Sequence, residues 1–328
     1  MALNFSYPIT AEKTTMTWFA LATYKSKGMP VPAIVVSGKL YDLKAAAKAA
    51  KTAGLKAEWL AGGVETIMRE WKTAGPMLRK AGPAIARLAE GGRLKAVGAA
   101  DKLAMAPYRP SRIFCAASNF IEHANEMTTV LAAKSDSKPY MFLKLQNTVI
   151  GPREMVRKPP ETKMLDWEVE LAAVIGKRAR RVPPARALDY VAGYSIVNDV
   201  SARDLNMRTD YPFKFDWFQG KCHDTFAPFG PWIVPAWLIK DPQDLRMQLT
   251  VNGKSMQDDS TKNMIWTVRE QIAYLSTIVT LEPGDVIATG TPAGVGMGRG
   301  VYLKHGDIME ASLEKIGTLR NPVAAEKV

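Results

Sequence analysis

Cysteine and histidine are scarce in this chain of 328 residues, which contains two cysteines and three histidines. Two cysteines are too few for a disulfide framework, and such sparing use is typical of a reducing compartment. Cys115 lies in an apolar run and is expected in the core, whereas Cys222 follows Lys221 and is a minor candidate for a reactive thiol. The sequence therefore predicts a protein without structural disulfides.

Long hydrophobic runs are also missing. No uninterrupted apolar stretch approaches the roughly 20 residues that a membrane-spanning helix needs. The first residues, up to Tyr24, lack the basic start, apolar core and small-residue cleavage site that mark a signal peptide. We therefore expect a cytoplasmic protein.

Acidic residues are fewer than basic ones: the chain has 32 Asp and Glu against 44 Lys and Arg, which gives a net charge of +12. Such a charge permits nucleic-acid or membrane-surface binding, so its distribution matters. Between Lys39 and Arg112 we count about 15 basic and 6 acidic residues, spread over expected helices with few aromatic residues among them. We interpret them as a solvated surface and expect neither nucleic acid nor membrane as a partner.

The first hundred residues predict a smaller α/β unit. Two strands are expected over Thr17–Tyr24 and Ala33–Tyr41, and helical faces follow over Leu43–Ala53 and Met77–Leu94. Glycine and proline break the periodicity between Gly91 and Pro110. We therefore divide the chain into an accessory domain, residues 1–104, and a larger domain, residues 105–328.

The stretch from Leu165 to Arg203 holds the densest arrangement of residues that burial alone does not explain. An apolar strand carries Glu168 and Glu170 on one face, because side chains alternate along a strand. A second buried strand ends at Asp199 and would add a third carboxylate if the two strands pair. Three hard oxygen ligands favour Mg²⁺, Mn²⁺ or Ca²⁺ over zinc. The alternative is a solvated edge strand followed by a turn-forming aspartate.

A second candidate group lies earlier in the chain, where a buried strand beginning at Ile113 turns into a helical pattern. On a helix His123 and Glu126 are neighbours, so the carboxylate can fix the imidazole tautomer and raise its basicity. A histidine held in this way is a suitable general base for water. The alternative is a surface histidine with an incidental acidic neighbour.

Several linked motifs occur in one order from about residue 105 to the carboxyl end. They are Asn119-Phe-x-x-His123-x-x-Glu126, Phe142-Leu-Lys144, Asp166-Trp-Glu168-Val-Glu170-Leu-Ala, Asn198-Asp199-Val-Ser-Ala-Arg203-Asp204, Gln219-Gly-Lys221, Thr289-Gly-Thr291-Pro-Ala-Gly-Val-Gly and Ile316-Gly-Thr-Leu-Arg-Asn-Pro. In this order the chain resembles the fumarylacetoacetate hydrolase family over some two thirds of its length.

This resemblance implies an α+β fold that is mainly β, with a mixed β-roll catalytic domain, usually in a homodimer. It implies Mg²⁺ or Mn²⁺ bound by Glu168, Glu170 and Asp199. The family's substrates are 2-oxo acids with a second carbonyl or enol, such as acylpyruvates, oxaloacetate and ring-cleavage products. Members hydrolyse or decarboxylate carbon–carbon bonds, and some hydrate or isomerise, so the fold alone does not choose among these reactions.

The same motifs suggest how a keto acid would be held. Lys221 would supply positive charge to a carboxylate or enolate, and Arg203 could do the same. Thr291 lies in a glycine-lined turn and would donate to the substrate carboxylate. Lys144 and Asn206 complete the expected substrate-binding residues.

Two segments depart from the family pattern. Cys222 and His223 follow Lys221 where a small and an aromatic residue are frequent, so His223 could reach the pocket or simply pack. The aromatic segment Tyr211–Phe218 is either a packed loop or dimer contact, or a pocket wall for a bulky acyl group.

These observations favour a metal-dependent hydrolase that cleaves a carbon–carbon bond in a 2,4-dioxo acid. In this hypothesis His123, oriented by Glu126, activates water, and Lys221 stabilises the enolate that leaves. The main alternative is decarboxylation, isomerisation or hydration of a 2-oxo dicarboxylic acid at the same site. A scaffold protein without catalysis is a more distant alternative, and a nucleic-acid role ranks last.

Overall fold

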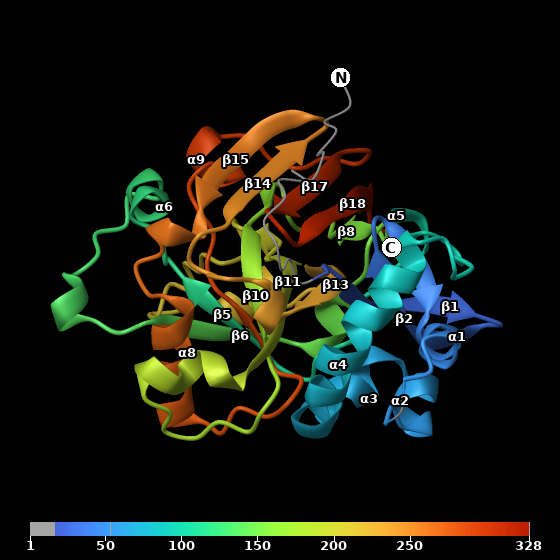
Figure 1. Ribbon diagram of the computed structural model, residues 1–328. Helices are drawn as coiled ribbons and strands as arrows, with labels where there is room; N and C mark the ends of the chain where they lie inside the picture. The colour runs from blue at the N-terminus through green and yellow to red at the C-terminus, as the bar shows by residue number, and fades with distance from the viewer. Residues whose placement is uncertain (1–16, 53, 328) are drawn as a thin grey trace.

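A large mixed sheet forms the centre of the computed structural model, which describes residues 17–52 and 54–327 (Figure 1). Eleven strands of the described residues belong to it, and β1, β13, β11, β10 and β16 occupy its middle. In spatial order they are β4 (Gly98–Ala99), β3 (Lys39–Asp42), β2 (Met29–Val36), β1 (Ala20–Ser26), β13 (Ala227–Pro235), β11 (Val191–Asn198), β10 (Val169–Ile175), β16 (Val286–Ala288), β5 (Ile113–Ala117) and β6 (Tyr140–Lys144), with β7 (Val149–Ile150) beside β13.

A second sheet packs against the first through β14, β17 and β18. Its five strands in the described part of the chain are, in order, β15 (Lys254–Ser260), β14 (Arg246–Val251), β17 (Ile308–Leu313), β18 (Gly317–Ala325) and β8 (Val156–Lys158). One hydrophobic cluster joins the inner faces of both sheets and includes Leu171, Leu249 and Ala311. A separate two-stranded sheet pairs β9 (Leu165–Asp166) with β12 (Ser201–Ala202).

The helices lie around the sheets (Figure 1). The α-helices are α1 (Leu43–Ala49), α2 (Ala57–Ala61), α3 (Gly63–Arg69), α4 (Trp71–Glu90), α5 (Ala100–Leu103), α6 (Ile121–Glu126), α7 (Trp217–Lys221), α8 (Val268–Ile278) and α9 (Gly296–Arg299). Short 3₁₀ turns are η1 (Lys134–Asp136), η2 (Gln146–Thr148), η3 (Pro184–Tyr190), η4 (Ala236–Leu238) and η5 (Thr261–Asn263). A second hydrophobic cluster packs α1, α3 and α4 against the other face of the large sheet.

The fold class is confirmed, since the chain is a mixed α/β protein with more strand than helix. The sequence predicts two strands near the amino end, and this number was wrong, because the structure has three there, β1, β2 and β3. A turn at Ser37 and Gly38, both at positive φ, divides Ala33–Tyr41 between β2 and β3. The helix expected to reach Ala53 ends at Ala49, and residue 53 lies outside the described residues. Helix α4 starts at Trp71, earlier than expected.

The amino-terminal strands continue the large sheet. Strand β1 pairs with β13 where Leu21 faces Ile233, and the second hydrophobic cluster contains residues from both sides of the expected boundary. The division after residue 104 therefore stays a prediction. In the described residues no helix is long and apolar enough to cross a membrane.

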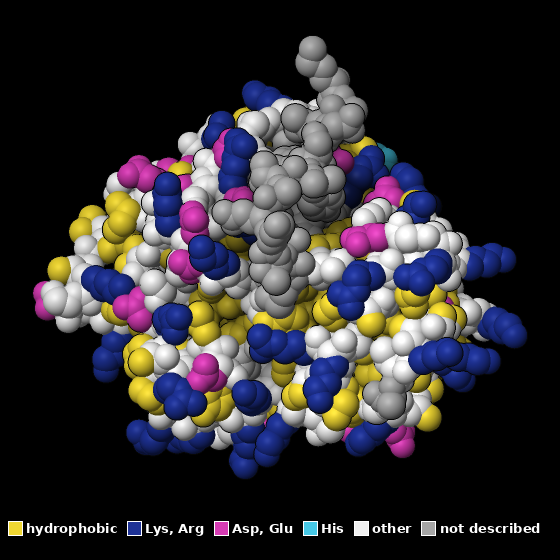
Figure 2. All heavy atoms as spheres, viewed as in Figure 1, with side chains coloured by type: hydrophobic (Ala, Val, Ile, Leu, Met, Phe, Trp, Pro, Cys, Tyr) yellow, Lys and Arg dark blue, Asp and Glu magenta, His cyan; other side chains and the backbone are white. Residues whose placement is uncertain are grey.

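Lys and Arg side chains are scattered over the face shown in Figure 2 and are not gathered into a single patch. Lys and Arg side chains are spread over its lower half, including the region of α3 and α4, with apolar and neutral atoms between them. On α4 the exposed basic residues Lys72, Arg79 and Arg87 alternate with buried apolar ones. This arrangement is that of an amphipathic helix with a solvated outer face.

Strands β10 and β11 position the site. Val169, Leu171 and Ala173 pack into the first hydrophobic cluster, and Ala172 and Val174 pack into the second. Both faces of β10 are therefore buried, which explains its continuous apolar sequence. Any carboxylate on this strand is withdrawn from bulk water.

Candidate active site

Three acidic side chains meet where β10 begins and β11 ends. One carboxylate oxygen from each of Glu168, Glu170 and Asp199 lies within 4.8 Å of the others, the one such acidic group among the described residues. Antiparallel pairing places Val169 opposite Asn198, and the Asp199 amide donates to the Glu168 carbonyl over 2.8 Å. The strand pairing expected from the sequence therefore brings the three carboxylates together.

Lys221 and Arg203 contact the same carboxylates. The Lys221 Nζ lies 2.8 Å from Asp199 Oδ2 and 3.1 Å from Glu168 Oε1. The Arg203 Nη2 forms an ion pair with Glu168 Oε1 at 2.5 Å. Burial lowers the pKa of Lys221, but Asp199 and Glu168 reverse this effect and raise it, so the ammonium stays charged.

Glu170 differs from Glu168 because its charge is not balanced. Burial raises the pKa of Glu170 well above its ordinary value, and Asp199 and Glu168 raise it further. Burial also opposes ionisation of Glu168, but Lys221, Arg203 and His123 lower its pKa to about 2. Glu170 Oε2 accepts from the Gly290 amide at 2.7 Å, whereas Oε1 is buried without a hydrogen-bond partner. A buried carboxylate oxygen left in this way is suited to a cation.

The charges of the site support the same conclusion. Four carboxylates and three basic side chains meet here in the described part of the chain, namely Asp166, Glu168, Glu170, Asp199, Lys144, Arg203 and Lys221. With every one of these groups ionised, the excess is one negative charge. A divalent cation would change this to one positive charge, which suits an anionic keto acid. The residues therefore fit Mg²⁺ or Mn²⁺.

His123 and Glu126 form the expected pair on α6. His123 Nδ1 lies 2.9 Å from Glu126 Oε1, and the imidazole is buried. Glu126 also accepts hydrogen bonds from the amides of Gly294 and Val295, with the shortest at 2.9 Å. The carboxylate therefore fixes the imidazole and attaches α6 to the loop after Thr291. A positive charge on His123 is one of the influences that lower the pKa of Glu168, after those of Lys221 and Arg203.

Lys144 and Thr291 use their donors within the protein. Lys144 Nζ donates to the carbonyls of Val200 and Phe226 over 2.8 and 2.5 Å and lies 2.7 Å from Asp199 Oδ1. The Thr291 hydroxyl donates to the Val169 carbonyl over 2.9 Å. Each side chain would have to give up a contact before it could donate to a substrate. Their substrate-binding roles stay predictions, and the structure shows both as supports of the strands.

Asn206 is buried beside α7. Its Oδ1 has no hydrogen-bond partner, and a Cβ on Gly220 would lie 1.6 Å from that atom. Glycine is therefore required at position 220, immediately before Lys221. The orphaned oxygen is consistent with a ligand-binding role for Asn206, which also stays a prediction.

Sequence reasoning missed two buried supports, Asp166 and Gln257. Asp166 pairs with Arg203 and accepts from backbone amides, although it was visible only as one letter of a motif. Gln257 accepts from the Val169 amide and donates to Thr291 Oγ1 and the Pro292 carbonyl. It lies on a strand of the other sheet, and nothing in its local sequence indicated this contact.

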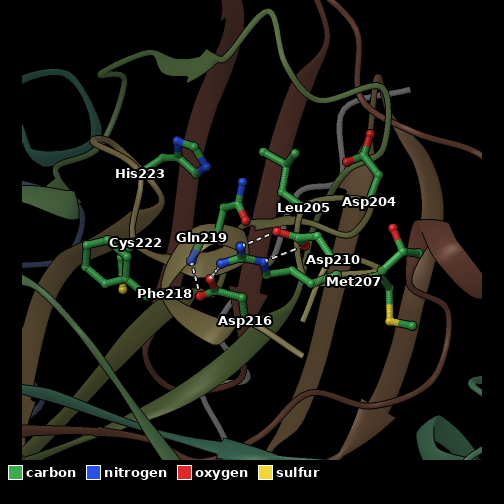
Figure 3. Close-up of a pocket in the computed structure, with 11 residues that line it drawn as sticks. Asp204, Leu205, Met207, Asp210, Asp216, Phe218, Gln219, Cys222 and His223 are labelled. Carbon is green, nitrogen blue, oxygen red and sulfur yellow. Dashed lines mark hydrogen bonds and ion pairs between the residues drawn. The ribbon is translucent and has the colours of Figure 1, made fainter. Parts of the chain in front are cut away.

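A cavity of about 570 Å³ lies beside α7 (Figure 3). Its walls include His223, Cys222 and Gln219, and Arg208 bonds to Asp210 and Asp216 within it. His223 therefore reaches a cavity, but the carboxylates of the site do not line that cavity. Burial raises the pKa of the Cys222 thiol, which disfavours the reactive thiolate.

The aromatic segment Tyr211–Phe218 is largely exposed. Phe218 is its one aromatic residue that lines the described cavity, whereas Phe213 is 79% exposed. Trp217 stacks on Phe142, with 4.9 Å between ring centroids. The Lys221 Nζ lies over the Phe142 ring, 5.2 Å from its centroid. The base of the segment therefore contacts the site, and its tip faces solvent.

Comparison with known proteins places this arrangement among relatives. Residues 112–324 match the model of the fumarylacetoacetate (FAA) hydrolase C-terminal domain. A 2,4-didehydro-3-deoxy-L-rhamnonate hydrolase from Sphingomonas sp. (strain SKA58) is 45% identical over 63% of this chain and 70% of its own length. The mitochondrial oxaloacetate tautomerase of Rattus norvegicus is 37% identical over 73% of this chain and 75% of its own.

Solved structures show the same fold. A fumarylacetoacetate hydrolase from Exiguobacterium antarcticum has a TM-score of 0.72 and 34% identity, and the match covers 94% of this chain and all of that one. A fumarylpyruvate hydrolase from Pseudomonas aeruginosa, solved with Mn²⁺ and pyruvate, has a TM-score of 0.60 and 32% identity over 67% of this chain and 91% of its own. Named relatives thus include both hydrolases and tautomerases.

Proposed function

Because the chain belongs to the fumarylacetoacetate hydrolase family, we propose that it hydrolyses a carbon–carbon bond in a 2,4-dioxo acid with Mg²⁺ or Mn²⁺ as cofactor. The observation that carries this proposal is the buried group of Glu168, Glu170 and Asp199, together with a buried histidine that is held by a carboxylate. When bound, the cation would supply Lewis acidity and a point of attachment for the 2-oxo acid.

The general base in this proposal is His123. Its Nδ1 is occupied by Glu126, so the other ring nitrogen is left to take a proton from water. The water oxygen then bonds to the distal carbonyl carbon. As the carbon–carbon bond breaks, its electron pair passes into the enolate, and His123 returns the proton to the leaving carbon. The products are a carboxylic acid and a 2-oxo acid.

Lys221 has the second role. It is charged and buried, and it lies against Glu168 and Asp199. A fixed ammonium in a site withdrawn from water stabilises negative charge that develops on the enolate oxygen. Arg203 is held by Asp166 and Glu168, so we assign it the role of fixing these carboxylates in place, and the substrate contact expected from the sequence stays a prediction.

Tautomerisation of a 2-oxo dicarboxylic acid is the second candidate. The relative named as an oxaloacetate tautomerase favours it, and the same histidine could move a proton between carbon and oxygen without water attack. Decarboxylation and hydration stay open alternatives at this site.

Product analysis separates these candidates. Purified protein with Mn²⁺ is incubated in parallel with acylpyruvates of increasing acyl size and with freshly dissolved oxaloacetate. Hydrolysis produces equal amounts of carboxylic acid and pyruvate. Loss of the enol absorbance of oxaloacetate, without carbon dioxide release and without acylpyruvate cleavage, would replace our proposal with the tautomerase. Carbon dioxide release would replace it with the decarboxylase.

We also propose a homodimer that forms through the aromatic segment and β6, with the cytoplasm as its compartment. In the described residues β6 is an edge strand, Tyr140 and Leu143 on it are exposed, and the Tyr140 ring lies 6.0 Å from that of Trp217. A strand edge can pair with its own copy across a two-fold axis, and exposed apolar patches are typical of interaction surfaces. The two free cysteines are compatible with a reducing compartment.

A further inference from the structure

Four consecutive backbone amides, from Gly294 to Met297, bind two different carboxylates. We call these residues the amide segment. The Gly294 and Val295 amides donate to Glu126, the closest over 2.9 Å. The Gly296 and Met297 amides donate to Asp166 over 2.5 and 3.0 Å. One short stretch of backbone therefore holds a residue of the histidine pair and a residue next to the candidate metal ligands.

Asp166 connects this segment to the carboxylate group. It is fully buried on β9, and its Oδ2 accepts from Arg203 Nε over 2.8 Å. The same guanidinium contacts Glu168 through Nη2 at 2.5 Å. Both oxygens of Asp166 therefore have partners, and one of these partners bridges directly to a candidate metal ligand.

Glycines allow the close approach of the two carboxylates. A Cβ on Gly296 would lie 2.6 Å from Asp166 Oδ1, and a Cβ on Gly298 would lie 2.6 Å from Glu126 Oε2. Gly294 has a φ of +102°, and its Cβ would lie 2.1 Å from the Met256 carbonyl oxygen. Gly296 and Gly298 admit the two carboxylates only because they have no side chains, and Gly294 admits the Met256 carbonyl for the same reason.

We propose that Asp166 is a positioning residue that couples the two halves of the site. Through Arg203 it fixes Glu168, and through the amide segment it fixes Glu126 and thereby His123. This inference rests on the proposed function for the roles of Glu168 and His123. Position 166 requires an aspartate because both of its oxygens accept hydrogen bonds. Asparagine would replace one acceptor oxygen by an NH₂ donor, which would face either the guanidinium or a backbone N–H.

The test is Asp166→Asn with two readouts other than turnover. Mn²⁺ affinity is measured by electron paramagnetic resonance of the free ion. The environment of His123 is measured in metal-free protein from its ring carbon–hydrogen resonance, which is resolvable because the chain has three histidines and His123→Gln assigns it. We expect Mn²⁺ affinity to fall about 10-fold, as for other residues that support metal ligands, and the His123 resonance alone to shift.

Three variants serve for comparison. Asp204→Asn is the matched control, because Asp204 lies next to Arg203 but bonds to Thr162 and Lys163, and both readouts should stay as in the wild type. Arg203→Lys should lower only Mn²⁺ affinity. Glu126→Gln should shift only the His123 resonance. A folded Asp166→Asn protein that changes one readout or neither overturns the proposal.

If Asp166→Asn does not fold, hydrogen exchange in the wild-type protein tests the proposed coupling. Hydrogen exchange of the amide segment should slow when Mg²⁺ is added, and Arg203→Lys should abolish that slowing. Equal slowing in both proteins, or none in the wild type, would overturn the coupling. Failure of the wild type to bind Mn²⁺ or Mg²⁺ would instead refute the proposed metal dependence, and the His123 resonance of the metal-free variants would still test the contact between Asp166 and the amide segment.

Discussion

The two halves of the candidate site are built in different ways. Glu168, Glu170 and Asp199 lie at the ends of two central strands, and none is more than 5% exposed. His123 and Glu126 lie on α6, a helix of six residues after which the chain extends away from the body (Figure 1). The side chain of Glu126 is 18% exposed.

This difference indicates which half can change without the other. The carboxylates are held by strand pairing and by three buried basic residues, so they should keep their arrangement whenever the protein is folded. The position of α6 depends on fewer contacts, including those of Glu126 with the amide segment. Metal binding and proton transfer should therefore be separable by mutations that leave Asp166, the proposed shared support, in place, and the predictions below test that separation.

Glu170→Gln should have the largest effect. The amide can still accept from Gly290, so the fold is retained, but the cation loses a charged ligand. We expect no measurable Mn²⁺ after dialysis and no metal-dependent turnover, with metal-free stability equal to or above that of the wild type, because a buried charge has been removed. Elemental analysis and thermal unfolding measure both effects.

Glu161→Gln is the control for that substitution, because Glu161 is exposed. Retained Mn²⁺ in the Glu170→Gln protein would show that the three carboxylates do not form the metal site.

His123→Gln should have the next largest effect. Loss of a general base costs about 10²- to 10⁴-fold in turnover. Because the strands that carry the carboxylates are untouched, Mn²⁺ affinity should change less than about 3-fold. Steady-state kinetics and Mn²⁺ titration measure the two quantities, and Glu122→Gln, on the exposed side of the same helix, is the control. Equal losses of turnover and affinity would contradict the separation of the halves.

The stability of the metal-free protein should depend on pH in two opposite directions. The raised pKa of Glu170 means that its contribution to stability is complete below the ordinary glutamate pKa of 4.5 and is lost as the pH rises through the raised value. The lowered pKa of Glu168 means that its contribution is present above 4.5 and is lost as the pH falls towards about 2.

Thermal unfolding across this range, with and without Mg²⁺, measures the balance. We expect Mg²⁺ to remove the alkaline loss, because the cation stabilises the ionised form of Glu170. The same alkaline loss should be missing from Glu170→Gln without metal. An alkaline loss that persists in that variant would assign it to another group.

Phe213→Ser should have the smallest effect on folding. Since this side chain is 79% exposed, the free energy of unfolding of the monomer should change by no more than about 0.5 kcal/mol. If the aromatic segment joins two copies, sedimentation should show a shift from dimer to monomer. Met155→Ser, at another exposed apolar residue, is the control. A Phe213→Ser protein that sediments as the wild type does would reject this surface as the interface.

Much of the site could be predicted because its residues lie in short, regular patterns. The alternation of β10 placed Glu168 and Glu170 on one face, and the helical spacing of His123 and Glu126 predicted their contact. The helical periodicity of residues 266–279 likewise predicts a helix from the sequence alone, and this segment forms α8, which starts after Thr267 with a capping box. The Asn252-Gly253 pair is a hairpin signal in the sequence, and β14 and β15 do turn there, with both residues at positive φ.

Contacts between distant segments could not be predicted in this way. Asp166 and Met297 are 131 positions apart, and Gln257 reaches Thr291 from the other sheet. The saturation of Lys144 by two carbonyls and a carboxylate is likewise invisible in its local sequence. The same holds for the pairing of β1 with β13, which joins the amino-terminal region to the large sheet.

The amino-acid sequence by itself determined which residue types are available for chemistry and, through the two periods of strand and helix, which of them share a face. Only the tertiary structure decided that Glu170 keeps an unpaired oxygen while Glu168 is surrounded by cations, because that difference depends on side chains that arrive from separate strands and loops. Local patterns restrict neighbours within a few residues, whereas burial and charge balance are set by everything that packs around a group.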